Sequence, residues 1–460
     1  MEEIRILSPT AILGYGFPEE SFKEGMKRKP HVIAVDAGST DPGPYYLGAG
    51  KSFTDRNAVK RDLMYMIPAA LKEGIPVVIG TAGGSGANEH LYWNVDIIKE
   101  ISKELNIDFK LAIIEAEIDK ETIIKKLKAG KVKPLEPAPE ITEKDVLDSE
   151  NIVAQMGFEP FIEALEAGAQ VIAAGRAYDP AVFSSLAIMK GFDKGLAIHL
   201  GKILECAAIA AAPGSGSDCM FGYLGKDWFR VEPLSPIRKC TTLSVAAHTL
   251  YEKSNPVLLP GPGGVLDLRE TTFTQETENT VIVKGSKFTP TDGYFLKLEG
   301  VKEVGYRTVS FAGTRDPVMI SQIDNIIEAV RARVKNNFEN FGITEFFLDI
   351  KLYGKNGTMG IFKDLNFPAG EEMGILIEAV AKTQEQANTI CSFARSTMLH
   401  YGYEGRISTA GNLAFPFSPS DFPAGKVFVF SVYHLMEVDS PIECFPIKHY
   451  NCAGGELNEL

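Results

Sequence analysis

The sequence lacks the features that mark several large classes of protein. Basic residues are in deficit, since 47 Lys and Arg stand against 60 Asp and Glu, for a formal net charge of -13. A nucleic-acid-binding surface needs clustered positive charge, so we expect no nucleic-acid partner. The six cysteines form no C-x-x-C pair, and the seven histidines form no H-x-x-x-H or H-E-x-x-H pattern. We therefore expect reduced thiols and no histidine-rich zinc site.

Long hydrophobic runs are also missing. The most apolar long stretch, Leu196 to Pro213, contains His199, Lys202 and Glu205 and falls short of a membrane span. The first residues, Met1 to Arg5, show no basic segment leading into an apolar core, which a secretory signal would have. We therefore expect a cytoplasmic protein with no membrane partner.

The length of 460 residues predicts two or three domains, because domains usually run to about 100–200 residues. Over 1–215, apolar runs alternate with amphipathic stretches, which predicts an α/β domain with a Rossmann-like, doubly wound, mostly parallel sheet. A mixed α/β middle region is expected over 216–340, and an α+β domain with an antiparallel sheet over 341–460. The elements expected in that last domain are strands at 345–353, 371–380 and 426–434, and a helix at 383–401.

The strands expected in the first domain end in polar or glycine-rich loops. These strands are 4–7, 32–35, 75–80, 109–114 and 170–174, with helices over 57–73 and 88–105 and further helix starts at Glu159-Pro160 and Pro180. Because the carboxyl ends of parallel strands share one edge of a sheet, we expect these loops to gather there. The proline-rich segment 131–140 is interpreted as a surface excursion of this domain, and 258–264 as a rigid turn.

One strand end is especially rich in polar groups. The apolar run 32–35 predicts a strand buried on both faces. It ends on Asp36 and opens into a loop with Ser39, Thr40 and Asp41, where Gly and Pro exclude a helix. We predict Asp36 as a catalytic residue and the other three as substrate contacts. The alternative is a plain connection whose polar groups satisfy only the loop.

A glycine-rich turn follows the next strand. Gly83, Gly84, Ser85 and Gly86 precede a predicted helix, with His90 in its first turn. Backbone N–H groups at a helix start can bind an anion, so these four residues are predicted substrate contacts and His90 a catalytic base. The alternatives are that the glycines only let the helix pack close to the strand and that the histidine is structural. The spacing fits no nucleotide-binding fingerprint, so no nucleotide cofactor is predicted.

Charged residues end the last two strands of this domain. Glu115 and Glu117 follow one strand, and Arg176 and Asp179 follow the other. Glu115 is the third predicted catalytic residue. Arg176 and Asp179 are predicted to bind the substrate, because Arg captures carboxylates in a bidentate way. The alternative is an Arg176–Asp179 ion pair that fixes the loop.

A divalent metal is the one cofactor that the pattern allows. Asp36 and Asp41, together with Glu115 and Glu117, could supply an all-oxygen site for such an ion. Solvated loop carboxylates are the alternative, and the metal ligands stay unassigned.

The segment Val35 to Thr40 also resembles the D-x-G-[ST] phosphate loop of actin-like and sugar-kinase ATPases. That loop belongs to a β-hairpin, whereas a helix is expected after this strand. The two partner motifs of those ATPases are not found, so an ATPase reading is not favoured.

Further motifs extend through nearly the whole chain. They are GSTDPGP at 38–44, GIP at 74–76, GTAGG at 80–84, GR at 175–176, DP at 179–180, His248 with Tyr251, PGG at 262–264, GYR at 305–307, RDP at 315–317 and GNLAFP at 411–416. With this set the chain resembles the acyclic terpene utilisation AtuA-like family. The resemblance implies a role in the catabolism of branched, terpenoid-like carboxylic acids through their thioesters.

The resemblance also implies partners. The expected ligand is a small carboxylate or acyl-thioester. Some relatives look longer at the C-terminus, which implies that a small separate subunit supplies the missing part, and an oligomer is expected. The family supplies no set of catalytic residues, so the site prediction rests on the strand-end loops.

Together these loops predict an enzyme, a lyase, hydratase or isomerase that moves a proton next to a carbonyl. Carboxylates would act as bases, while glycine-rich N–H groups and Arg176 would hold a developing oxyanion. His248, Tyr306 and Arg307 of the later region could close over the sheet edge. The alternative is a non-catalytic anion-binding or assembly subunit of a catabolic complex.

Overall fold

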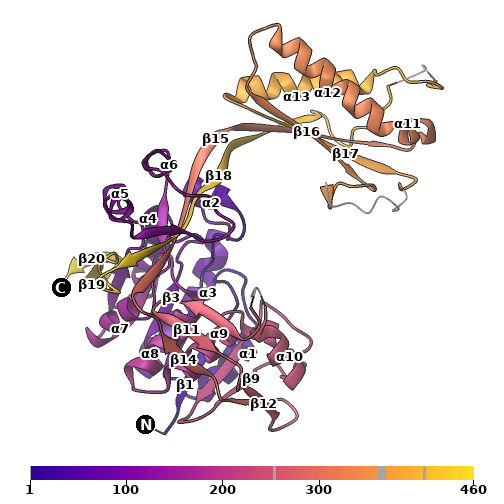
Figure 1. The fold of residues 1–460 in the computed structure, drawn as a ribbon. Helices are drawn as coiled ribbons and strands as arrows, with labels where there is room; N and C mark the ends of the chain where they lie inside the picture. The colour runs from indigo at the N-terminus through magenta and orange to yellow at the C-terminus, as the bar shows by residue number, and fades with distance from the viewer. Residues whose placement is uncertain (1, 252–254, 361–368, 408–410) are drawn as a thin grey trace. The chain divides into compact units, whose positions relative to one another are not determined.

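A computed structural model describes residues 2–251, 255–360, 369–407 and 411–460 (Figure 1). The chain forms two compact units, one of Met1–Lys302 with Phe430–Leu460 and one of Glu303–Val429. Strands β15 (Tyr294–Thr314) and β18 (Asp421–Val438) run from one unit into the other. The sequence-based boundaries near 215 and 340 thus differ from the places where the chain passes between these units.

An 11-stranded sheet organises the first unit, in the order β12-β13-β9-β8-β1-β2-β3-β7-β4-β19-β20. Its parallel centre consists of β1 (Ile4–Ser8), β2 (Val32–Asp36), β3 (Val77–Gly80), β7 (Val171–Ala174) and β4 (Phe109–Ile114). Antiparallel strands flank this centre, namely β8 (Met220–Leu224), β9 (Phe229–Pro233), β12 (Thr272–Gln275), β13 (Val281–Lys284), β19 (Ile447–Ala453) and β20 (Glu456–Glu459). The predicted α/β class with a parallel sheet is confirmed, and the antiparallel margins are additional.

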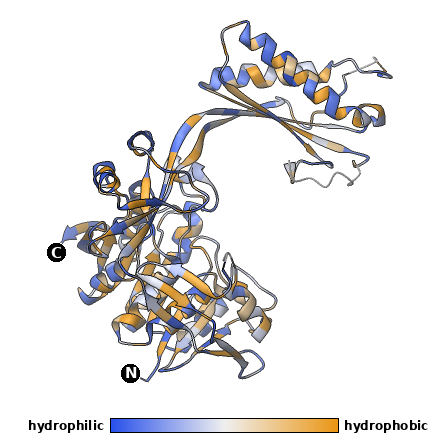
Figure 2. Cartoon of the chain, in the orientation of Figure 1, coloured by the Kyte–Doolittle hydropathy of each residue, from blue (hydrophilic) through white to orange (hydrophobic). Residues whose placement is uncertain are grey.

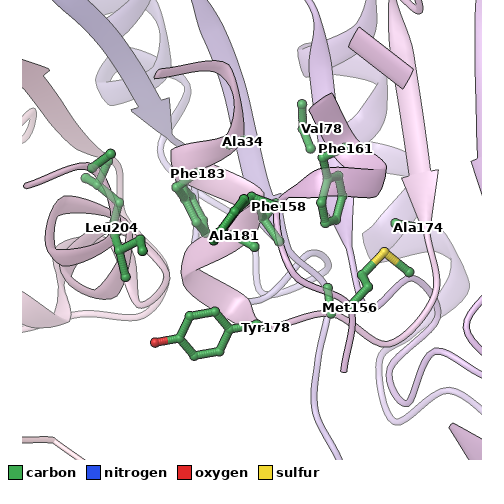
Figure 3. Close-up of a cluster of buried hydrophobic side chains, with 14 of the residues drawn as sticks. Ala34, Val78, Met156, Phe158, Phe161, Ala174, Tyr178, Ala181, Phe183 and Leu204 are labelled. Carbon is green, nitrogen blue, oxygen red and sulfur yellow. The ribbon is translucent and has the colours of Figure 1, made fainter. Parts of the chain in front are cut away.

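The central strands are mostly apolar, as expected of strands that helices cover on both faces of the sheet. One face packs on α1 (Glu19–Lys27), α3 (Arg56–Glu73) and α4 (Asn88–Leu105), and its core includes Ile33 and Ile79. The other face packs on α7 (Glu159–Glu166), α8 (Asp179–Met189) and α9 (Lys194–Leu204). Figure 3 shows part of this second core, in which phenylalanines gather beside Ala34 and Val78 of adjacent strands.

Shorter elements complete the first unit. They are α2 (Pro44–Ala49), α5 (Lys120–Lys128), β5 (Val132–Pro134), α6 (Glu143–Leu147), β6 (Ile152–Ala154), η1 (Ala207–Ala210), α10 (Thr242–Thr249), β10 (Leu258–Gly261), β11 (Gly264–Asp267) and β14 (Lys287–Pro290). One interpretation is corrected by them: the segment 258–264 is a β-hairpin in a three-stranded sheet with β14. The 131–140 excursion belongs to the first unit and is mostly exposed or half-buried, as interpreted, and its first residues form β5, which pairs with β18.

The second unit follows the order β15, α11 (Pro317–Ser321), α12 (Ile323–Glu339), β16 (Phe346–Tyr353), β17 (Met373–Ala381), α13 (Gln384–Leu399) and β18. Its strands lie in the order β16-β17-β15-β18, which is the ferredoxin-like β-α-β-β-α-β arrangement. α12 and α13 pack on this sheet through their own core. In Figure 2 both helices alternate between apolar and polar residues, as expected of helices with one buried side. The predicted C-terminal α+β fold with an antiparallel sheet is confirmed.

Two general predictions are also tested. All six cysteines are free, as predicted. Within the described residues, no helix is long and apolar enough to cross a membrane.

Candidate functional site

The loops after β2, β3 and β7 meet at one edge of the sheet of the first unit. The Ala37 N–H donates to the Gly80 carbonyl over 2.9 Å, and the Thr81 N–H donates to the Gly175 carbonyl over 3.0 Å. β3 leads into α4 on one face, whereas its neighbour β7 leads into α8 on the other. Ligand sites of α/β sheets usually lie beside such a reversal.

A cavity of about 240 Å³ lies at this edge. Four acidic residues line it, namely Asp36, Asp41, Asp179 and Glu205. The rest of the lining is mostly apolar or aromatic: Ala11, Ile12, Tyr15, Pro42, Phe53, Ile209 and Tyr251, with Ser39 and Cys206. The cavity therefore combines a carboxylate-rich part with a hydrocarbon surface.

Asp36 is the most deeply placed acid of this lining. It ends β2, its side chain is almost fully buried, and its Oδ1 accepts the Ala37 N–H over 2.9 Å. Burial, and next the negative charge of Asp179, raise the pKa of Asp36 well above its ordinary value. A raised pKa makes the carboxylate a stronger base, which suits general acid–base chemistry.

Arg176 lies behind the cavity in a buried ion-pair network. Its Nε donates to Glu299 over 2.6 Å, and its Nη1 donates to Asp179 over 3.1 Å. Lys297 lies 2.8 Å from the same Glu299 carboxylate. Burial opposes the charge of Arg176, but Glu299 and Asp179 outweigh it and raise the pKa of Arg176. The structure thus contains the Arg176–Asp179 pair of the alternative interpretation, and a direct contact of Arg176 with substrate stays a prediction.

The three loop residues after Asp36 take different positions. Ser39 and Asp41 line the cavity, and the Ser39 hydroxyl donates to Asp41 over 3.0 Å. Thr40 is buried and donates to Glu299 over 3.0 Å. Glu299 therefore joins the β2 loop to the β7 loop through one carboxylate.

The glycine-rich turn is packed against backbone. Gly83, Gly84, Ser85 and Gly86 are all buried. A Cβ at Gly38 would lie 2.1 Å from the Gly84 carbonyl oxygen, and a Cβ at Gly86 would lie 2.2 Å from the Arg176 nitrogen. These close approaches fit the alternative interpretation, in which the glycines serve close packing. Because the four residues do not belong to the lining of the cavity, their contact with a ligand stays a prediction.

His90 and Glu115 also lie outside the lining of this cavity. His90 Nε2 lies 3.0 Å from the Tyr46 carbonyl oxygen, and burial lowers the pKa of His90. Glu115 accepts hydrogen bonds from Tyr92 and Lys448, each over 2.6 Å. Burial raises the pKa of Glu115, but these two partners outweigh it and leave that pKa below its ordinary value. Their catalytic roles stay predictions.

The four carboxylates considered for a divalent ion do not form one group. Asp36 and Asp41 line the cavity, while Glu115 pairs with Lys448 and Glu117 accepts the Asn88 N–H over 3.0 Å. Across the described ranges, no cluster of three or more His, Cys, Asp or Glu side chains is arranged to hold a metal ion. The four carboxylates therefore do not form the all-oxygen metal site that the sequence allowed.

Sequence reasoning missed much of the lining of the cavity, including Glu205 and Tyr251. Glu205 follows α9 and forms a buried ion pair with Lys202, while Tyr251 follows α10 and stacks on His248 at 5.5 Å. A signal was present, because three polar residues interrupt the most apolar stretch of the chain. The third polar residue of that stretch, His199, lies within hydrogen-bonding distance of Ser286 and Thr249.

The fold and the cavity define a class, that of α/β proteins with an acidic cavity at the carboxyl ends of parallel strands. A sequence profile for the acyclic terpene utilisation family protein AtuA matches residues 52–215 and 238–415. The chain belongs to this family. Neither the curated proteins nor the solved structures provide a match. The family description refers to the utilisation of acyclic terpenes, which fits a catabolic role and specifies no reaction.

Proposed function

We propose that the protein is an enzyme of carboxylic-acid or acyl-thioester catabolism, and that it moves a proton on a carbon next to a carbonyl group. The reaction class is that of a lyase, hydratase or isomerase. One observation carries the proposal: Asp36 combines near-complete burial and a raised pKa with a place in the cavity lining. Perturbed carboxyl groups in cavities are characteristic of acid–base catalysis.

In the proposed reaction, the Asp36 carboxylate removes a proton from the carbon beside the carbonyl. The electron pair of that C–H bond moves toward the carbonyl oxygen. The Asp36 carboxyl then returns the proton, either to another carbon of the chain or to a departing hydroxyl group. A group that must both accept and donate a proton works best when its pKa lies close to the working pH.

The position of the site supports the proposal as well. The parallel centre with helices on both faces suits the Rossmann-like, doubly wound interpretation, in which ligands enter beside the reversal between β3 and β7. We propose that Ser39, Asp41 and Asp179 contact the substrate, since all three line the cavity with Asp36. Arg176, held by Glu299, fixes Asp179 from behind.

The experiment is a proton-exchange assay in D₂O. The protein is incubated with a panel of branched acids and their coenzyme A thioesters, and deuterium in the acyl group is measured by mass spectrometry. We expect exchange with at least one panel member, and we expect Asp36→Asn to lower its rate by about 100-fold or more. Asp96→Asn, which removes an acid from the exposed side of α4, is the matched control and should keep the wild-type rate.

If Asp36→Asn folds normally and keeps its rate within a few-fold, Asp36 is not the acid–base group. If no panel member exchanges deuterium, the non-catalytic binding or assembly role becomes the better explanation. In that case a small separate subunit and the oligomeric state, which stay predictions, are the next targets, through light scattering of the purified protein and its co-purifying partners.

A further inference from the structure

The sheet of the second unit ends in an unprotected edge strand. Among the strands of the described residues, β16 lies at the end of this sheet and pairs with β17 alone. It has eight residues in continuous register with β17, and it contains neither proline nor glycine. Native proteins usually protect an edge with a short strand, a proline or a bulge, because its unpaired N–H and C=O groups can pair with another chain. β16 has none of these three devices, so its outer edge can take a further strand.

The sequence of β16 is complementary to itself when it is read in the opposite direction. Residues 347–353 read FLDIKLY, which is aromatic, leucine, acid, isoleucine, base, leucine, aromatic. Consider a second copy that runs antiparallel across a two-fold axis at Ile350. Asp349 then lies opposite Lys351 of the second copy, and Lys351 lies opposite Asp349 of that copy. Opposite charges that face each other across antiparallel strands stabilise the pairing.

Only this register suits the charges. Moving the axis to Asp349 or to Lys351 would place like charges directly opposite each other, which is unfavourable. Moving the axis by half a residue would turn the apolar face of one copy against the mixed face of the other. The axis at Ile350 also places the aromatic ring of Phe347 opposite that of Tyr353 in the second copy.

The two faces of the strand agree with this register. Ile350 and Leu352 are buried in the core under the helices, so pairing would continue that apolar layer from one copy into the other. Phe347 and Tyr353 lie on the other face and are 56% and 45% exposed. An aromatic pair across two strands would cover part of both rings.

A side chain of α12 has to give way. Arg331 donates to Asp349 over 2.9 Å, and the two side chains are 38% and 27% exposed. An ion pair with this exposure contributes little to stability, so Asp349 can exchange Arg331 for Lys351 of the second copy. Lys351 keeps its own contact with Glu378, which lies 2.7 Å away. The charges of Asp349 and Lys351 cancel, so this edge adds no net repulsion between two chains that each carry -13.

We infer that β16 is the dimerisation strand of this protein, and that it pairs antiparallel with β16 of a second copy about a two-fold axis at Ile350. The pairing joins the sheets of the two second units into one sheet. A two-fold contact is closed, so it yields a dimer and no fibre. The contact is short and belongs to the small class of interfaces, below about 1,200 Å², so we expect a micromolar dissociation constant. An oligomer was expected from the family resemblance, and the strand, the register and the partner are new. The dimer does not depend on the proposed reaction, because β16 belongs to the second unit.

The test exchanges the two charges and measures sedimentation velocity of the full chain from about 1 to 100 µM. Lys351→Asp leaves only carboxylates at the facing positions, and Asp349→Lys leaves only ammonium groups. Each variant alone should raise the dissociation constant by at least about tenfold. An equimolar mixture of the two should associate within about threefold of the wild type, because every acid then faces a lysine. Lys226→Asp makes the same charge change in the exposed turn between β8 and β9, and should keep the wild-type association.

A second variant keeps the test valid where a charge variant fails to fold. Phe347→Ser removes an exposed aromatic ring and changes no charge. It should also raise the dissociation constant by about tenfold, since a two-fold contact carries each substitution twice.

Three results would overturn the inference. A wild-type chain that stays monomeric at about 100 µM would leave the edge of β16 to a different occupant. Variants that associate like the wild type would place the contact between copies on another surface. Folded, monomeric charge variants whose mixture stays monomeric would show that the acid and the lysine do not face each other.

Discussion

Glu299 shows how a single buried residue can hold a site together. Burial raises the pKa of its carboxyl, but Arg176 and Lys297 outweigh this effect and bring that pKa to about 2. The same carboxylate accepts the Thr40 hydroxyl, so it fixes loops that are far apart in the sequence. Its role is to position these groups, because it does not line the cavity.

We expect Glu299→Gln to lower the free energy of unfolding by about 3 kcal/mol, because it removes the main counter-charge of buried Arg176. The uncompensated charge of Arg176 should also lower the pKa of Asp36 and move the acid limb of the exchange rate to lower pH. Urea unfolding and a pH–rate profile measure the two effects. Glu378→Gln is the control, since its partners Arg307 and Lys351 are more than one-third exposed, and it should cost about 1 kcal/mol or less. A purely structural Glu299 would leave the pH–rate profile unmoved.

Protonation of His248 should make the stability of the folded protein depend on pH in the acid range. Burial, and next the charge of Lys202, lower the pKa of His248 to about 4 in the folded protein. The unfolded chain, with an ordinary histidine pKa near 6.5, takes up the proton first as the pH falls. Stability should therefore decrease between about pH 6.5 and pH 4, by about 3 kcal/mol for this group. Urea midpoints across this range should fall less steeply in His248→Gln than in wild type or in His400→Gln, where the histidine is exposed.

At the scale of elements, the glycine-rich turn before α4 depends on backbone contact. Gly86 has φ +73°, and an added Cβ would lie 2.2 Å from the Arg176 nitrogen. Gly74 after α3 has a similar φ of +66°, but nothing lies within 4 Å of its added Cβ. The two positions therefore share the conformational cost and differ in the steric one.

Gly74→Ala should cost about 1 kcal/mol of unfolding free energy, from the left-handed backbone alone. Gly86→Ala should cost a further 1–3 kcal/mol or so, because the turn must move away from Arg176. Urea denaturation of the two variants measures the difference. Equal losses would show that the close approach of the turn to Arg176 is not required.

The sequence predicts elements well where one pattern dominates. α4 and β4 have the predicted bounds, because one shows helical spacing and the other an unbroken apolar run. The pattern of residues 294–298 predicts only the start of β15, which continues to Thr314. The residue after position 298 is Glu299. A charged residue in a buried strand can be recognised only when Arg176 and Lys297 are known to surround it.

The same limit applies to the site. The carboxyl ends of parallel strands meet at one edge of a sheet. Four residues predicted from strand ends therefore line the cavity, namely Asp36, Ser39, Asp41 and Asp179. Glu205 comes from the end of a helix, and no local pattern says which strand end that helix will face. Residue spacing likewise cannot show that Glu115, unlike the acids of the cavity, pairs with a lysine. That partner, Lys448, is hundreds of residues away in the sequence.

At the scale of the whole molecule, each unit has its own core. The residues of the core in the second unit all lie between Ala312 and Leu413, and the two cores on the sheet of the first unit contain none of them. Units with separate cores can unfold in separate steps. We therefore expect two transitions in a calorimetric scan of the full chain.

Two core variants assign these transitions. Ile377→Ala in β17 should destabilise only the second unit, and Ile172→Ala in β7 only the first, each by about 2–5 kcal/mol. Both side chains are buried, so the lesions are matched. A single transition that both variants shift would show that the units unfold together.

The path of the chain through the two units has a consequence for its synthesis. β19 pairs with β4 of the central sheet, but residues 303–429 separate it from the rest of the first unit. During synthesis on the ribosome, the edge of β4 therefore stays unpaired until residues 303–429 have been made and β19 follows. An uncovered edge strand is prone to pair with other chains. The second unit, whose own core is contiguous in sequence, can fold during this delay. The first unit, although its synthesis begins earlier, is completed only afterwards.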